Sequence, residues 1–293
     1  MAPQEDAAPP APEGVDVDKP SAARIYDWFL GGTHNYAVDR EFGKKVLAGF
    51  PIVRPIARSN RAWMNRVVRA AVDAGLRQFL DLGSGVPTVG NVHEVVREAL
   101  PEGEQATVVY VDYEEVAAAH ARITLDQQEV TDWVSFVQGD LREPERILSD
   151  PETKRLIDPS RPVCVLLVAA LHFLGPDDAP VDLVARYREK LVPGSWLAIS
   201  HVTMDDIPTE EVSGALKVVE AYKSTSNPYW VRTRDEIGEF FGDWRLIEPG
   251  LVHLPDWRPD ATQELAADDD EARPYVWGGI AERPAPARLR RTR

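Results

Sequence analysis

Three acidic residues stand at the ends of short apolar segments in the first half of this chain. Asp81 precedes two glycines one residue apart, Gly83 and Gly85, and the next two apolar segments end near Asp112 and Asp140. Parallel sheets bind ligands at the carboxyl ends of their strands, where such acids would meet. We therefore expect a ligand site built from a glycine turn and three carboxylates.

The glycine turn differs from one that binds a dinucleotide. The dinucleotide fingerprint has a third glycine three residues after Gly85, where this chain has Thr88. A carboxylate at Asp81 would repel a pyrophosphate and attract a ligand with cationic groups. S-adenosylmethionine is such a ligand, because it carries an ammonium group and a sulfonium but no phosphate.

The order of the acids along the predicted sheet matches the length of this cofactor. We expect Asp81 to attract the ammonium end, directly or through water, and Asp112 to accept hydrogen bonds from both ribose hydroxyls. Asp140 would accept a hydrogen bond from the adenine amino group, with the Leu141 backbone close to the ring. One acid after a strand is more often a turn or cap residue, so the prediction depends on the succession of three.

Methyl transfer from a sulfonium is an in-line displacement, in which positioning supplies much of the rate. A base is needed only when the acceptor enters as a protonated hydroxyl or ammonium. His172 and His201, near the ends of the fourth and fifth apolar segments, are the candidates. His172 is preferred, since a pKa near neutrality would let it take a proton. The alternative is a structural, hydrogen-bonded histidine at each position.

An aromatic helix and polar loop near the N-terminus form a second candidate surface. We predict that this segment makes a lid that excludes water and orients the acceptor, through Tyr26, Gly31, Gly32, Asn35 and Tyr36. His201, from the fifth apolar segment, is also predicted to contact the acceptor or the lid. The double glycine would let the backbone approach a ligand closely. The alternative is that the aromatic residues only pack the helix onto the core.

Composition limits the partners. The net charge of −15 disfavours a general polyanion-binding role, so we expect a small-molecule acceptor and no nucleic acid. The single cysteine, Cys164, excludes an internal disulfide framework and a cysteine-rich metal site. No metal is expected, although Asp205 and Asp206 leave a magnesium site as a minor alternative.

No membrane partner is expected either, and we predict a cytoplasmic protein. The longest apolar runs are about half of the roughly 20 residues that a membrane helix needs. The proline-rich, acidic N-terminus lacks the basic and apolar regions of a signal peptide. The sequence makes no prediction of oligomeric state.

Alternating strand and helix patterns must position these groups. Five strand-like segments are separated by helical ones, and two more strands end the chain, over 79–82, 107–111, 133–137, 163–171, 196–202, 245–252 and 275–281. This pattern indicates a doubly wound α/β fold with an antiparallel edge. Four regions follow: a disordered lead (1–20), a helical cap (21–75), a Rossmann-like core (76–283) and a basic tail (284–293). The cap helices are predicted over 22–30, 39–48 and 55–74.

The chain resembles the class I, Rossmann-like S-adenosylmethionine-dependent methyltransferases, and more narrowly an actinobacterial family formerly listed as a domain of unknown function. Matching segments extend from about Pro20 to Ile280 and include 23–32, 60–61, 79–85, 109–112, 140–142 and 166–173. The resemblance implies a mostly parallel, seven-stranded sheet whose last strand is antiparallel. This chain departs from the class pattern at Pro87, which stands where the usual third glycine would be.

The resemblance also assigns S-adenosyl-L-methionine as the cofactor. The predicted cofactor contacts are Asp81, Gly83, Ser84, Gly85, Asp112, Tyr113, Asp140, Leu141 and Ala169. The expected activity is methyl transfer to an oxygen or nitrogen of a small molecule, which the resemblance does not identify. Two alternatives remain: a non-catalytic protein that binds S-adenosylmethionine or S-adenosylhomocysteine, and an NAD-dependent oxidoreductase.

Overall fold

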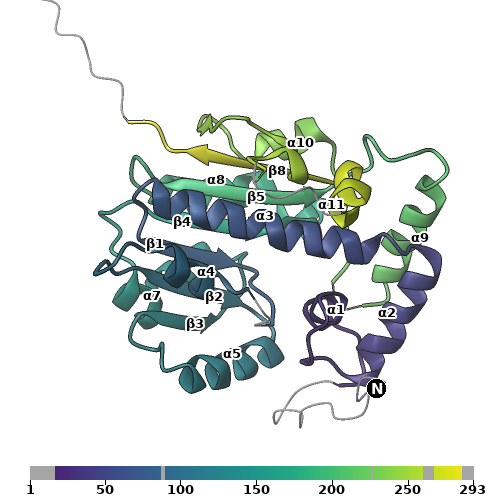
Figure 1. The fold of residues 1–293 in the computed structure, drawn as a ribbon, viewed down its shortest axis with the longest axis horizontal. Coiled ribbons are helices and arrows are strands. Elements are labelled where there is room, and N and C mark those ends of the chain that lie inside the picture. Colours follow the sequence, from purple (N-terminus) through teal and green to yellow (C-terminus); the bar gives the residue numbers. More distant parts are fainter. Residues whose placement is uncertain (1–16, 87–89, 226, 260–266, 286–293) are drawn as a thin grey trace, which may run out of the picture.

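The computed structural model describes residues 17–86, 90–225, 227–259 and 267–285. The predicted disordered lead and basic tail lie almost entirely outside these ranges, as do Pro87 and Thr88. Within them the chain forms one large sheet with helices on both faces (Figure 1).

Five parallel strands form the centre of the sheet: β1 (Gln78–Leu82), β2 (Thr107–Asp112), β3 (Val134–Gln138), β4 (Cys164–Val168) and β5 (Trp196–Val202). The strand order is β3-β2-β1-β4-β5-β8-β6, and β8 (Val276–Glu282) runs antiparallel to β5. The doubly wound fold with an antiparallel last strand is confirmed. The reversal of order between β1 and β4 places the carboxyl ends of both strands beside a crevice.

The described sheet has eight strands rather than the expected seven. The strand predicted over 245–252 is divided into β6 (Arg245–Leu246) and β7 (Val252–His253), which both pair with β8. A turn separates them, closed by a 2.8 Å hydrogen bond from the Gly250 amide to the Ile247 carbonyl. Pro249 lies inside this turn and lacks an amide donor, so the strand could not continue through it.

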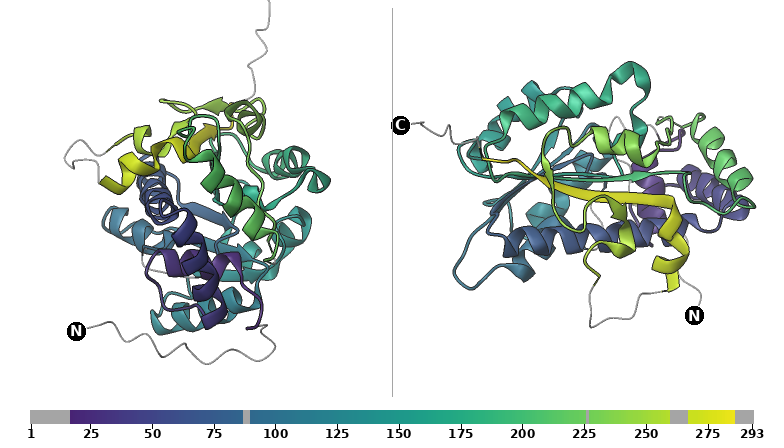
Figure 2. Two further views of the ribbon diagram at one scale, coloured as in Figure 1. Left: turned by 90° about the vertical axis from the view of Figure 1, so that its right-hand side faces the viewer. Right: turned by 90° about the horizontal axis from the view of Figure 1, so that it is seen from above.

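Helices cover both faces of the sheet in two separate layers (Figure 2). Alternate side chains of the strands pack against these two layers. Phe79 of β1 joins one buried cluster, and Leu80 and Leu82 join the other. The first layer contains α3 (Val53–Asp73), α4 (Val92–Ala99) and α5 (Glu115–Gln127). The second contains α6 (Pro144–Ser149), α7 (Pro151–Leu156), α8 (Pro180–Lys190) and α10 (Arg234–Glu239). Burial on both faces explains why the strands read as continuous apolar runs.

Two short cap helices lie beyond one end of the sheet, next to the start of the long α3 (Figure 1). They are α1 (Ala22–Phe29) and α2 (Ala37–Gly49), and α2 contacts α9 (Val212–Tyr222). Their bounds lie within two residues of the predicted ones, and the Ser21 hydroxyl caps α1 by accepting from the Arg24 amide at 3.4 Å. The remaining elements are α11 (Ala267–Ala272) and the 3-10 helices η1 (Leu171–Phe173), η2 (Pro176–Asp178), η3 (Leu254–Asp256) and η4 (Arg273–Tyr275).

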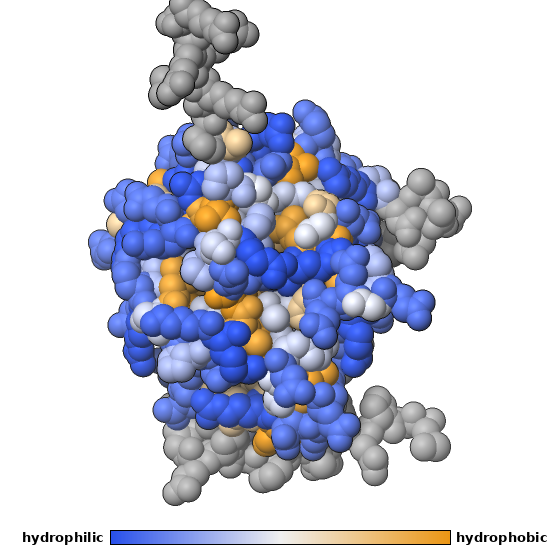
Figure 3. All heavy atoms as spheres, turned by 90° about the vertical axis from the view of Figure 1, so that its left-hand side faces the viewer, coloured by the Kyte–Doolittle hydropathy of each residue, from blue (hydrophilic) through white to orange (hydrophobic). Residues whose placement is uncertain are grey.

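The side of the molecule at the left of Figure 1 is largely hydrophilic. Figure 3 shows this face with apolar residues scattered between charged ones. Scattered apolar residues of this kind are normal on a protein surface. Over the ranges given above, no helix is both long and apolar enough to span a membrane.

Candidate active site

A cavity of about 480 Å³ lies between the carboxyl ends of β1 to β5 and the helices α1 and α3. Most of the predicted site residues contribute to its wall: Tyr26, Asp81, Gly83, Ser84, Gly85, Asp112, Tyr113, Asp140, Leu141, Ala169, His172 and His201. The parallel strands bring these residues together because their carboxyl ends share one edge of the sheet.

The glycine turn after β1 has a backbone that other residues would not adopt easily. Gly83 and Gly85 have φ values of +76° and +67°, and a Cβ on Gly83 would lie 2.7 Å from the Ala170 Cβ. The Val111 carbonyl holds the turn by accepting from the amides of Gly83 and Ser84 at 2.8 and 3.0 Å. The Ser84 hydroxyl is buried with no partner among the described residues.

Asp112 lines the cavity at the end of β2 and fits the predicted contact with the ribose. Its Oδ2 accepts from the Gly85 amide at 2.8 Å and its Oδ1 accepts from the Glu114 amide at 3.0 Å. These bonds fix the carboxylate and leave lone pairs on both oxygens for two further donors. Burial raises its pKa above the usual range, and the backbone donors partly offset this.

Asp81 is a buried acid in the wall of the cavity. Burial raises its pKa to about 7, although the nearby Arg61 guanidinium opposes the shift. A ligand cation beside this carboxylate would favour its ionised form. The cofactor's ammonium group supplies such a cation, so the residue fits the predicted role.

Asp140 is more engaged than expected, because Arg142 holds it. The Arg142 amide donates to Oδ1 at 2.9 Å and its guanidinium Nη2 donates to Oδ2 at 2.6 Å. Partial burial would raise the pKa of Asp140, but these bonds outweigh it and lower the pKa. Arg142 also reaches Asp178 at 3.2 Å. An adenine amino group at Asp140 would therefore share the carboxylate with Arg142.

A chain of hydrogen bonds joins the cap to the end of β4. The Tyr26 hydroxyl accepts from Asn60 Nδ2 at 2.9 Å, and Asn60 Oδ1 accepts from the Ser200 hydroxyl at 2.6 Å. Ser200 Oγ in turn accepts from the Ala169 amide at 2.9 Å. Ala169 has a φ of +55°, a strained conformation for alanine, and this chain holds it there. Sequence reasoning missed Ser200, whereas Asn60 lay in a segment of the family resemblance.

His172 faces the cavity from η1 and is 4% exposed. Its Nδ1 is buried without a partner in the described structure. The predicted pKa near neutrality is wrong: burial lowers the pKa well below the usual range, and His201 and Arg232 add to the shift. The ring is therefore uncharged at neutral pH.

His201 differs from His172, because both of its ring nitrogens have partners. Nδ1 donates to the Val202 carbonyl and Nε2 accepts from Arg232 Nη1, each at 2.8 Å. Burial lowers its pKa to about 3. Arg232 also donates to the carbonyls of Leu171 and Leu174, so it ties η1 to β5. Sequence reasoning did not find Arg232, since no local pattern marks it.

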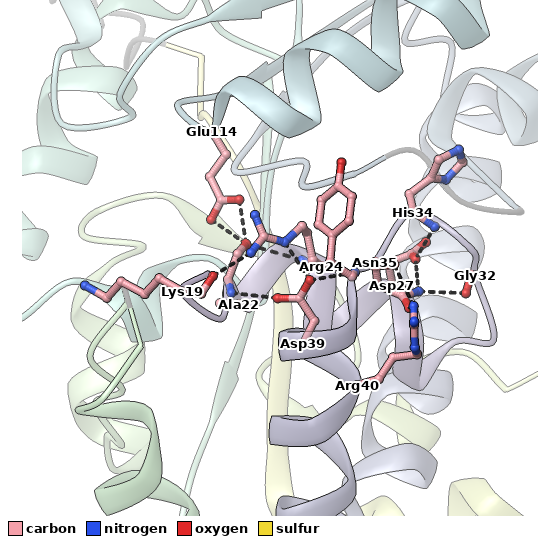
Figure 4. A network of polar contacts seen from close by, with 12 residues as sticks. Lys19, Ala22, Arg24, Asp27, Gly32, His34, Asn35, Asp39, Arg40 and Glu114 are labelled. Carbon is pink, nitrogen blue, oxygen red and sulfur yellow. Dashed lines mark hydrogen bonds and ion pairs between the residues drawn. The ribbon is translucent and has the colours of Figure 1, made fainter. Parts of the chain in front are cut away.

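The lid prediction needs correction, because only Tyr26 of the proposed N-terminal residues lines the cavity. Asn35 Nδ2 donates to Asp27 Oδ2 at 2.8 Å and to the Gly32 carbonyl at 2.9 Å (Figure 4). A Cβ on Gly32 would lie 1.9 Å from Asp27 Oδ1, and this contact explains the second glycine. Gly31 has a φ of +84° at the end of α1, and Tyr36 is buried beneath Arg24.

A second polar network holds the cap against the loop after β2 (Figure 4). Arg24 and Asp39 form a buried ion pair at 2.7 Å, and Asp39 Oδ1 accepts from the Ser21 amide at 3.0 Å. The Ser21 hydroxyl donates to Glu114 Oε1 at 2.7 Å. Burial raises the pKa of Glu114 to about 7, with a further contribution from Asp112. The cap is thus connected to the predicted ribose site.

A model of the S-adenosyl methyltransferase family matches residues 8–284. The chain belongs to this family. A protein from Thermobifida fusca described as a “putative methyltransferase” is 36% identical, with a TM-score of 0.81 over 92% of this chain and 97% of its own. A DUF574 family protein from Streptomyces avermitilis is 34% identical, with a TM-score of 0.82 over 92% and 99%.

A more distant match shows the fold alone. An O-methyltransferase family protein from Burkholderia thailandensis is 19% identical, with a TM-score of 0.52 over 92% of this chain and 65% of its own. A search of curated proteins found no match.

The family establishes this methyltransferase as one that uses S-adenosylmethionine, which confirms the cofactor prediction. The site fits that cofactor through the unpartnered Ser84 hydroxyl, the spare lone pairs of Asp112 and the buried carboxylate of Asp81. In the described part of the chain, no group of three or more His, Cys, Asp or Glu residues could hold a metal ion.

Proposed function

We propose that this methyltransferase transfers the methyl group of S-adenosylmethionine to an oxygen or nitrogen atom of a small molecule that binds beside His172. The observation that carries this proposal is His172 itself, which lines the cavity that contains the predicted cofactor contacts and whose buried Nδ1 has no partner among the described residues. A buried polar atom without a partner costs free energy, so a ligand that bonds to it gains affinity and orientation.

The strand order supports a direction for the two ligands. Asp140 follows β3, Asp112 ends β2 and Asp81 lies in β1, so adenine, ribose and methionine would lie across β3, β2 and β1 in that order. β4 and β5 continue the sheet beyond β1, and His172 lies in η1, shortly after β4. The methyl group would then face the part of the cavity beside His172.

The charge of the cavity wall supports a small molecule rather than a nucleic acid. Two arginines, Arg61 and Arg142, line the cavity together with six acids, which are Asp81, Asp112, Glu114, Asp140, Asp177 and Asp178. Nucleic-acid binding depends on cations that neutralise phosphates.

We also propose a cytoplasmic location, which the buried, unpaired Cys164 supports.

The chain's own residues have three tasks in this reaction. Bound S-adenosylmethionine supplies a methyl group on a positively charged sulfur. Asp81 would hold the ammonium group and Asp112 the ribose, on either side of the sulfur, and the cap would exclude water above them. His172 accepts a hydrogen bond from the acceptor, which turns the acceptor's lone pair toward the methyl carbon. Because the pKa of His172 is low, any proton that it takes passes readily to water.

A label-transfer experiment tests this function. The protein is incubated with S-adenosylmethionine carrying a tritiated methyl group and a heat-treated extract of actinobacterial cells. Unreacted cofactor is removed by chromatography, and the labelled products are then divided by dialysis. We expect the label in a dialysable product and none when the protein is boiled first. Label that remains only with protein or nucleic acid would contradict the proposal.

A further inference from the structure

Aromatic rings from two segments far apart in the sequence wall the cavity beside His172. Phe173 belongs to η1, Tyr222 ends α9, and Tyr229 lies in the loop after α9. Tyr229 has its ring centroid 4.8 Å from that of His172, 5.8 Å from that of Phe173 and 5.1 Å from that of Tyr222. We call Phe173, Tyr222, Tyr229 and His172 the aromatic subsite.

The two segments are joined, so the subsite has a fixed shape. The Trp230 amide donates to the His172 carbonyl at 2.7 Å. The Trp230 ring lies against Gly175, where an added Cβ would be 3.0 Å from the indole. Trp230 lines the cavity and is 41% exposed, so it stands at the rim of the subsite. Such a preformed wall binds a rigid ligand with little loss of conformational entropy.

The polar atoms of the subsite are uncharged. Burial raises the pKa of both Tyr222 and Tyr229 above the usual range and lowers that of His172. The arginines of the cavity wall lie elsewhere: Arg142 binds Asp140 and Asp178, and Arg61 lies near Asp81. Arg232 lies behind His172, but it does not line the cavity, and its guanidinium donates to the carbonyls of Leu171 and Leu174 and to His201. A neutral ligand suits this environment better than an anion, because an anion would lose its hydration without contacting a cation.

We propose that the aromatic subsite binds a planar aromatic alcohol as the methyl acceptor, with its ring against Phe173 and Tyr229 and its hydroxyl on the His172 ring. This inference rests on the proposed function and adds the class of acceptor. Aromatic rings prefer offset or edge-to-face contacts at centroid separations that the subsite already shows between its own members. A flat ligand ring can make such contacts, whereas a saturated ring cannot.

The transfer balances without a further reagent. The acceptor oxygen forms a bond to the methyl carbon as the bond from that carbon to sulfur breaks, and the bonding pair stays on sulfur. The hydroxyl proton passes to the His172 ring and then to water. The products are an aryl methyl ether, S-adenosylhomocysteine and one proton.

The first test compares aromatic alcohols with their saturated counterparts on the wild-type protein. Phenol and cyclohexanol, and naphthol and decahydronaphthol, are titrated calorimetrically into protein saturated with S-adenosylhomocysteine. At least one aromatic alcohol should bind about tenfold more tightly than its saturated counterpart, since aromatic pairs add to simple area burial. The proposal is overturned if neither aromatic alcohol binds more tightly than its counterpart.

The second test uses two phenylalanines that both contact Tyr222. The ring centroids of Phe173 and Phe42 lie 6.3 and 5.3 Å from that of Tyr222, but only Phe173 lines the cavity. Phe173→Leu should weaken the binding of the aromatic alcohol about tenfold, and Phe42→Leu should leave its dissociation constant unchanged. Equal effects of the two variants would overturn the proposal.

Binding of S-adenosylhomocysteine separates this inference from the proposed function. Both variants should bind it like the wild type, which also shows that they are folded. If wild-type protein binds S-adenosylhomocysteine but prefers the saturated alcohols, the acceptor class is wrong and the proposed function stands. If it does not bind S-adenosylhomocysteine at all, the proposed function fails.

Discussion

The two halves of the cavity differ in chemistry although one sheet edge carries both. Over β1 to β3 the wall presents carboxylates, which are Asp81, Asp112 and Asp140. Beyond β4 and β5 it presents aromatic rings and the uncharged His172, and two acids of η2, Asp177 and Asp178, also line the cavity. The first half suits a ligand of fixed chemistry with cationic and hydroxyl groups. The second suits an apolar ligand with one hydrogen-bonding atom.

This difference shows how one fold can keep a cofactor and change an acceptor. The carboxylates belong to the strand ends, so the sheet itself fixes them. Tyr222, Tyr229 and Trp230 belong to the end of α9 and the loop after it. A connecting segment can change its residues without disturbing the sheet, and binding residues often lie on such segments.

The largest expected effect concerns His172. His172→Gln should lower the rate of methyl transfer about 100-fold, at the lower end of the range for a general base because its pKa is depressed. The measurement is label transfer at saturating cofactor. His120→Gln is the control, since His120 is also buried, has an unpartnered Nε2 and lies outside the cavity wall. Equal losses in the two variants would remove His172 from the reaction.

Removal of the central carboxylate should come next. Asp112→Ala should weaken the binding of S-adenosylhomocysteine by about 2 kcal/mol, roughly 30-fold in the dissociation constant, because it removes charge-assisted hydrogen bonds at a desolvated site. Calorimetric titration measures the change. Asp150→Ala is the control, because Asp150 also accepts a backbone amide, from Glu152 at 2.9 Å, but lies away from the cavity. An unchanged dissociation constant for Asp112→Ala would remove this residue from the site.

The affinity for S-adenosylhomocysteine should rise with pH. The pKa of Asp81 is about 7 in the free protein, and a bound ammonium group lowers it, so binding releases a proton below that pH. A single group of this kind gives about tenfold tighter binding at pH 8 than at pH 6. Asp81→Asn should lose most of this dependence. Binding that weakens as the pH rises would contradict the role of Asp81.

The smallest effect concerns the link between the cap and β4. Tyr26→Phe removes a hydroxyl that bonds to Asn60 and to the Ala57 carbonyl, and should lower the free energy of unfolding by about 1 kcal/mol. Tyr36→Phe is a matched control, because the Tyr36 hydroxyl is buried with no partner among the described residues. Denaturant unfolding measures both. Equal destabilisation would show that the hydrogen-bond chain contributes nothing specific.

The cofactor half could be predicted from the sequence because its signals are local. Apolar segments give the strands, an acid marks where a strand ends, and parallel pairing brings those ends together. The acceptor half could not, because Tyr229 reaches His172 only through the path of the loop after α9. The sequence shows two neighbouring aromatic residues in Asn227-Pro228-Tyr229-Trp230, but nothing local shows which strand this segment covers.

The errors have physical causes as well. The lid was predicted from a double glycine, but Gly32 accommodates the buried Asp27 rather than a ligand. The pKa of His172 was expected near neutrality, but burial depends on tertiary packing that a sequence does not show. The extra strand follows from Pro249, whose position was visible and whose effect on the ladder was overlooked.

A crystal structure with S-adenosylhomocysteine tests the division of the cavity most directly. We expect the adenine beside Asp140 and Leu141, the ribose on Asp112, and the amino acid end on the turn at Gly83 near Asp81. The sulfur should then face His172 and the aromatic subsite. A cofactor that lies in the opposite direction, with its adenine among Phe173, Tyr222 and Tyr229, would contradict this account.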